Sequence, residues 1–125
     1  MSNPTLMKNF LAEAAIPAYR LVKLGTADGK VTTAVAATDL IVGPIMDVSP
    51  AIGERVDVVM VGIAYIEAGA AITRGSLVTS DSVGRCVTAA PAAGANNRCI
   101  GVAVEAATAA GDIITVQISP SMMQG

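Results

Sequence analysis

The sequence contains no histidine and no tryptophan, and it has only two cysteines and three aromatic residues. The absence of histidine removes the commonest general base, and with it the Ser-His-Asp and Cys-His catalytic arrangements. With Cys86 and Cys99 as the only thiols, one chain cannot assemble the usual four nitrogen or sulfur ligands of a zinc site. We interpret the two cysteines as buried thiols, with a disulfide as the alternative. These absences predict a protein that is not an enzyme and that holds no metal or cofactor.

Charge is also scarce, because only 14% of the residues are charged and the formal net charge is −2. A surface that binds nucleic acid by base stacking needs aromatic side chains in a basic groove, and this chain has few of either. No run of apolar residues approaches the roughly 18 that a transmembrane helix requires. The N-terminal segment has Glu13 within its apolar part, which is unlike a signal peptide. We therefore expect no nucleic-acid partner, no membrane, no small-molecule substrate, and synthesis in a cytoplasm.

What the chain does have is β-branched residues: 15 Val and 11 Ile stand against 6 Leu. This excess fits the pleated, half-buried surface of a sheet. Between Gly69 and Pro120, four short apolar runs alternate with turn residues, at positions 72–79, 85–89, 99–105 and 112–119. Such regular spacing is typical of a compact antiparallel β domain.

The preceding region follows the same pattern. Residues 19–24 and 31–35 alternate around Asp28-Gly29, a dipeptide that favours a tight hairpin turn. Residues 40–42 predict a further short strand, and residues 55–67 predict two alternating runs with a bend or bulge at Gly62. We predict a mainly β fold, a small antiparallel β-barrel or β-tulip-like domain over residues 18–125, because closure protects the edges of short strands.

Residues 1–17 are predicted to be an extended N-terminal arm. Leu6, Phe10 and Ala14 have helical spacing, so a short amphipathic helix before Pro17 is one interpretation. A frayed terminus is another, and an arm that docks on a neighbouring subunit is a third. For a docking arm, the contact residues would be the large apolar ones, which are costly to leave in water: Met7, Phe10, Leu11 and Ile16.

Three arginines, Arg74, Arg85 and Arg98, adjoin turns of the C-terminal half. They are either solubilising charges or ion-pairing residues that face a partner or a sister subunit. Asp57, Glu67 and Asp81 lie on separate predicted strands and loops, so we interpret them as solvated carboxylates. Ser76 lacks the Gly-x-Ser-x-Gly frame of a hydrolase nucleophile.

The succession AITRGSLVTSD, GRCVTAAP and RCIGVAVEAATAAGDIITVQI resembles the small cement, or decoration, proteins of tailed-bacteriophage capsids. The matching positions are Ile72, Gly75, Leu77 and Val78, then Ile100-Gly101-Val102, and finally Gly111-Asp112 with Val116. This family was earlier labelled a predicted phage recombinase of RecA/RadA type. The older label does not fit this chain, because its one Gly-Lys pair, Gly29-Lys30, is followed by Val31 and not by the Ser or Thr of a P-loop.

The resemblance implies a β-rich, tulip-like or barrel-like domain that forms homotrimers on the outer surface of the virion. There it would contact the major capsid protein and cement neighbouring subunits against the pressure of packaged DNA. A different class of function is a small β-barrel module that binds a receptor or a carbohydrate. Sugar binding usually employs exposed aromatic faces, for which only Tyr19 and Tyr65 are available.

Overall fold

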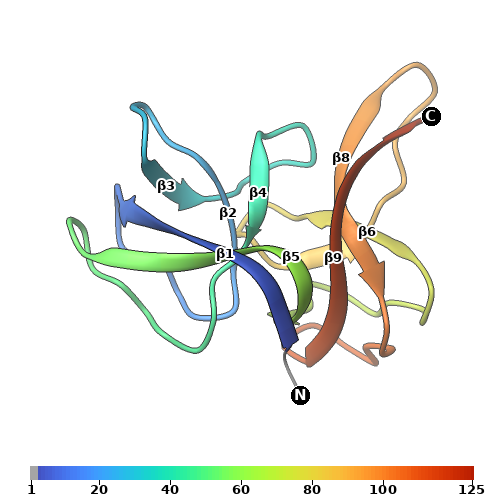
Figure 1. Ribbon diagram of the computed structural model, residues 1–125. Helices are drawn as coiled ribbons and strands as arrows, with labels where there is room; N and C mark the ends of the chain where they lie inside the picture. The colour runs from blue at the N-terminus through green and yellow to red at the C-terminus, as the bar shows by residue number, and fades with distance from the viewer. Residues whose placement is uncertain (1–2) are drawn as a thin grey trace.

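The computed structural model describes residues 3–125, and in this part of the chain every regular element is a β-strand (Figure 1). Accordingly, residues 3–125 contain no helix long and apolar enough to cross a membrane. The nine strands are β1 (Asn3–Ala12), β2 (Leu21–Leu24), β3 (Lys30–Thr33), β4 (Ile41–Pro44), β5 (Arg55–Glu67), β6 (Leu77–Ser80), β7 (Cys86–Thr88), β8 (Asn96–Ala103) and β9 (Ile113–Gln124). The predicted mainly β class is confirmed.

All nine strands belong to one sheet in the order β4-β2-β3-β1-β5-β9-β8-β6-β7. Every pairing is antiparallel except that of β1 with β3, which makes the sheet mixed. Strand β5 pairs with β1 from the start of the chain and with β9 from its end. The N-terminal strands therefore lie to one side of the β5/β9 pair and the C-terminal strands to the other (Figure 1).

The sheet is not closed into a barrel, but both of its ends return to β5. An isolated bridge joins Ile45, just after β4, to Val58 of β5. A second isolated bridge joins Ala68, just after β5, to Cys86 of β7. Strand β5 therefore belongs to two lobes. The N-terminal lobe consists of β1–β5 and the C-terminal lobe of β5–β9.

Two hydrophobic clusters fill these lobes. The smaller cluster lies in the N-terminal lobe and contains Phe10, Ala12, Ile16, Val22, Val31, Ile45, Val56 and Val58. The larger cluster contains most of the buried aliphatic residues of β5, β8 and β9, together with Leu21, Ala34 and Ile41 from the N-terminal half. Both thiols are free and buried, with Cys86 in the larger cluster.

The N-terminal segment differs from its predictions. Residues 3–12 form β1 and not a helix, and the residues expected to be an arm contribute a central strand. Register shifts between Pro4 and Leu6 and between Leu6 and Met7 make β1 irregular. The four-residue spacing of Leu6 and Phe10 fits the period of a strand as well as that of a helix. Hydrogen bonds continue beyond β1, from Glu13 N–H to Val31 O and from Ile16 N–H to Pro50 O.

Candidate interaction surfaces

The first candidate surface is an apolar face of the sheet, which we call the sheet face. Leu6 of β1 pairs with Val61 of β5, and these two side chains are 51% and 42% exposed. Paired residues lie side by side on the same face of a sheet. A further row of pairs crosses four strands: Ile63 with Gln117, Gln117 with Val102, and Val102 with Leu77. None of the six residues of the sheet face carries a charge.

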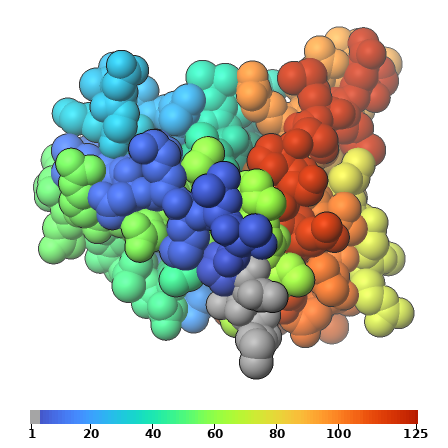
Figure 2. Space-filling model, in the orientation of Figure 1, coloured from blue at the N-terminus to red at the C-terminus, as the bar shows by residue number. Residues whose placement is uncertain are grey.

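The sheet face is contributed by segments from both ends of the chain. Figure 2 shows β1, β5 and β9 side by side on the side of the molecule that faces the viewer. A shallow hollow of about 320 Å³ lies between them, lined by residues that include Val61, Ile63 and Gln117. Large exposed apolar patches mark protein–protein contacts, and Leu6 and Val61 are the exposed large apolar residues of this face.

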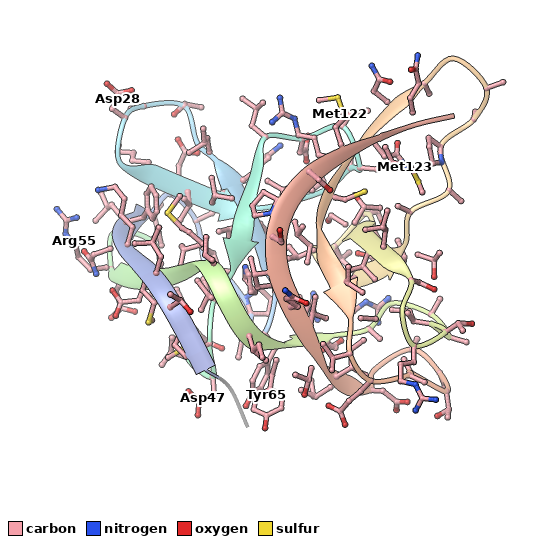
Figure 3. The ribbon with its side chains drawn as sticks, turned by 45° about the vertical axis from the view of Figure 1, so that its right-hand side comes forward. Asp28, Asp47, Arg55, Tyr65, Met122 and Met123 are labelled. Carbon is pink, nitrogen blue, oxygen red and sulfur yellow. The ribbon has the colours of Figure 1, made fainter. Side chains whose placement is uncertain are left out.

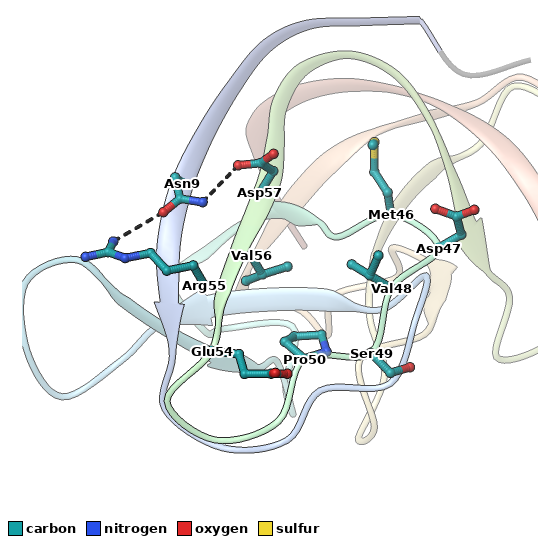
Figure 4. Close-up of a pocket in the computed structure, with 10 residues that line it drawn as sticks. All are labelled: Asn9, Met46, Asp47, Val48, Ser49, Pro50, Glu54, Arg55, Val56 and Asp57. Atoms are coloured by element: carbon teal, nitrogen blue, oxygen red, sulfur yellow. Dashed lines mark hydrogen bonds between the residues drawn. The ribbon is translucent and has the colours of Figure 1, made fainter.

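The second candidate surface is a groove beside the segment that connects β4 to β5. It has a volume of about 560 Å³ and is lined by Asn9, Met46, Asp47, Val48, Ser49, Pro50, Glu54, Arg55, Val56 and Asp57 (Figure 4). Asn9 connects two of the charged residues, because its Nδ2 donates to Asp57 Oδ1 at 3.0 Å and its Oδ1 accepts from Arg55 Nη1 at 3.2 Å. Three carboxylates and one guanidinium give this groove an acidic balance.

A smaller hollow of about 160 Å³ adjoins the groove and shares Met46 and Asp47 with it. We call it the tyrosine hollow, because Tyr19 and Tyr65, the only tyrosines of the chain, both line it. Figure 3 shows Asp47 and Tyr65 close together at the lower edge of the molecule. Hydrogen bonds from Tyr19 N–H to Met46 O and from Glu67 N–H to Tyr19 O hold the Tyr19 backbone at this point.

The four contact residues predicted for the arm have different positions. Phe10 and Ile16 are 4% and 1% exposed and belong to the smaller cluster, so the prediction that they are available for docking is corrected. Met7 is half-buried and packs against the larger cluster, while Leu11 is half-buried on β1. A contact of Met7 or Leu11 with another subunit stays a prediction.

The three arginines do not form one site. Arg74 is exposed in the turn before β6. Arg85 forms ion pairs within the chain, with Asp81 at 3.3 Å and with Glu67 at 3.7 Å. Arg98 lies half-buried on β8, where its carbonyl oxygen accepts a hydrogen bond from Thr79 Oγ1. Contacts of these arginines with a partner also stay predictions.

The thiols and the other titratable groups offer little chemistry. Burial raises the pKa of the Cys86 thiol to about 12, and burial also raises the pKa of Cys99. Both groups are therefore neutral and unreactive near pH 7. Within residues 3–125, no group of three or more His, Cys, Asp or Glu side chains is arranged to hold a metal ion.

Sequence reasoning did not find the residues that make the two surfaces. The sequence places Leu6 in a helical pattern, and it contains no motif that marks Met46 or Asp47 as a binding residue. Alternation does place Ile63 and Tyr65 on one side of their strand, and Tyr19 and Tyr65 are the aromatic residues named for a carbohydrate site. That both tyrosines line one hollow depends on pairings between distant parts of the chain.

Comparisons with known proteins concern the whole domain. A family model described as phage cement protein matches residues 3–118. The fold is similar to that in "The crystal structure of head fiber gp8.5 N base in bacteriophage phi29", with a TM-score of 0.68 and 22% sequence identity over 91% of this chain and 93% of that chain. At this identity the likeness shows a shared fold. No curated protein matches the sequence.

Proposed function

The chain belongs to the phage cement protein family, and from this membership we propose that it binds the outside of a tailed-phage head as a trimer and cements neighbouring major capsid subunits. As a member of this family it is a structural virion protein associated with the capsid. The finer parts of the proposal are the trimer, the outer position and the resistance to the pressure of packaged DNA. The uncharged sheet face is the observation that supports the trimer.

In this proposal the sheet face is the contact between sister subunits. Leu6 and Val61 are about half exposed in the single chain, although both are strongly apolar. Burying such side chains removes apolar surface from water at roughly 25 cal/mol per Å². A three-fold assembly would cover this surface on each copy and place three identical shell-binding surfaces on one particle. Three weak contacts made together hold a trimer far more firmly than one contact holds a monomer.

The first test of the trimer is a molar mass measured by light scattering. The purified protein should have three times the 12.5 kDa mass of one chain. Val61→Glu places a charge at the centre of the sheet face and should give a monomer. Leu24→Glu is the matched control, because Leu24 is also about half exposed (46%) but lies on β2, outside the sheet face. A wild-type monomer, or a Val61→Glu protein that stays trimeric, contradicts this assignment.

The second test concerns cementing. Heads assembled without the protein should release their DNA at a lower temperature than heads to which the wild-type protein has been added. Val61→Glu should restore much less of the lost stability than Leu24→Glu, since a monomer lacks the multivalent attachment. Heads that neither bind nor gain stability from the wild-type protein would overturn the proposed function.

A further inference from the structure

The tyrosine hollow has features that a trimer contact through the sheet face does not use. Its two tyrosines come from different places, Tyr19 from the segment before β2 and Tyr65 from β5. Tyr19 has a φ of 62°, which makes it the one residue other than glycine with a positive φ in the described chain. A bulky residue in this conformation is strained, and such strain persists where the surrounding structure fixes it, commonly at binding sites.

Asp47 supplies the charge of the hollow. Its side chain is exposed, and within residues 3–125 its carboxylate has neither a hydrogen bond nor an ion pair to another side chain. Aromatic rings attract cations through their negative faces, and a carboxylate adds a charge-assisted hydrogen bond. Met46 offers an apolar wall for the methylene stem of a long basic side chain. A lysine or arginine side chain can contact the tyrosine rings, the Asp47 carboxylate and Met46 at the same time.

The size of the hollow indicates one side chain and not a whole small molecule. Its volume of about 160 Å³ is below the roughly 300 Å³ at which pockets begin to enclose small ligands. The adjoining groove, at about 560 Å³, continues from Met46 and Asp47 toward Asp57 and Arg55. An extended polypeptide can lie along this groove while one of its side chains enters the hollow.

Charge complementarity identifies the kind of polypeptide. Asp47, Glu54 and Asp57 all line the groove, and Arg55 is its one basic residue, so its lining carries a net negative charge. We infer that the groove and the tyrosine hollow bind an extended basic segment of a partner protein, with a lysine or arginine side chain between Tyr19, Tyr65 and Asp47. This inference rests on the proposed function, in which the partner is a subunit of the phage shell.

The tyrosines provide a direct readout, because the chain has no tryptophan and both of its tyrosines line the hollow. The probe is an acetylated, amidated pentapeptide of alternating valine and lysine, titrated into the wild-type protein. The same peptide with glutamate in place of lysine is its control. The lysine peptide should shift the ring resonances of Tyr19 and Tyr65 and change the tyrosine fluorescence, whereas the glutamate peptide should leave both signals unchanged.

Three variants locate the binding. Asp47→Asn should weaken binding of the lysine peptide about tenfold, consistent with loss of a charge-assisted contact. Asp28→Asn is the matched control and should bind as the wild type does, because Asp28 is an exposed turn residue remote from Asp47 (Figure 3). Tyr19→Asn should also weaken binding, and asparagine tolerates the positive φ, so this variant keeps the backbone.

The inference is overturned if the two peptides shift the tyrosine signals equally, or if Asp47→Asn binds as tightly as Asp28→Asn. It is also overturned if a panel of neutral saccharides shifts these signals and the lysine peptide does not. Failure of the proposed function gives a different result: the wild-type protein itself would not bind heads. If Asp47→Asn trimers remain on heads as firmly as wild-type trimers through salt washes, the function stands and the groove assignment fails.

Discussion

Val58 and Val59 are consecutive residues of β5, and both side chains are fully buried, but they pack into different hydrophobic clusters. In an ordinary strand of a sheet with one solvated face, one of two neighbours would point to solvent. Here both faces of β5 are covered at this point, by the N-terminal lobe on one side and by the larger cluster on the other. Substitutions of the two valines therefore test the packing of the two lobes separately.

Replacing either valine with alanine should lower the free energy of unfolding by about 2 kcal/mol, because each change removes buried methyl groups from a filled cluster. Val35→Ala is the control and should change stability little, since Val35 is 50% exposed. Urea unfolding followed by circular dichroism measures all three. If Val58→Ala or Val59→Ala leaves the free energy of unfolding unchanged, the corresponding face of β5 is open in solution.

The close approach of β4 to β5 gives a second prediction. Gly43 has a φ of +149°, and a Cβ atom added there would clash with the carbonyl oxygen of Val59. Gly43→Ala should therefore cost roughly 3 kcal/mol or more, combining backbone strain with overpacking. Gly29→Ala, at φ +76° but with no atom within 4 Å, should cost only about 1 kcal/mol. Equal losses in urea unfolding would mean that β4 does not pack against β5 as described.

A third prediction concerns Glu67, whose Oε2 forms ion pairs with Arg20 Nη2 at 3.3 Å and with Arg85 Nη1 at 3.7 Å. Glu67→Gln should lower the free energy of unfolding by about 1–2 kcal/mol, because two partly buried guanidinium groups lose their shared charge. Lys23→Gln breaks the single Lys23–Asp39 pair and should cost less than about 1 kcal/mol. Urea unfolding at two salt concentrations measures both variants, and a larger loss for Lys23→Gln would contradict this ranking.

A fourth prediction follows from the pKa of Cys86, which burial raises from 9.0 to about 12. The folded state keeps the thiol proton in this interval, whereas the unfolded state releases it above pH 9. Stability should therefore fall as the pH rises from 9 toward 12, with this thiol contributing about 1.4 kcal/mol per pH unit. Cys86→Ala should show a slope smaller by that amount between pH 9.5 and 10.5. Identical slopes would show that the Cys86 thiol is open to solvent.

The sequence predicts the strands from residue 21 onward because alternating β-branched residues are separated there by glycine turns. The sequence does not predict β1 in this way, because the register shifts around Leu6 disrupt the alternation of its buried and exposed residues. The order of strands depends on pairings between distant segments, such as Tyr65 with Thr115, which leave no local pattern. For the same reason the sequence names Tyr19 and Tyr65 as isolated aromatics and cannot predict that one hollow contains both.

The position of β9 has a consequence for how the protein is made. Strand β5 is synthesised before β9, so in a growing chain one edge of β5 has no partner until residues 113–118 have left the ribosome. Gln117 of that same segment belongs to the sheet face. In the proposed trimer, subunits can therefore join through this face only after residue 118 has been translated.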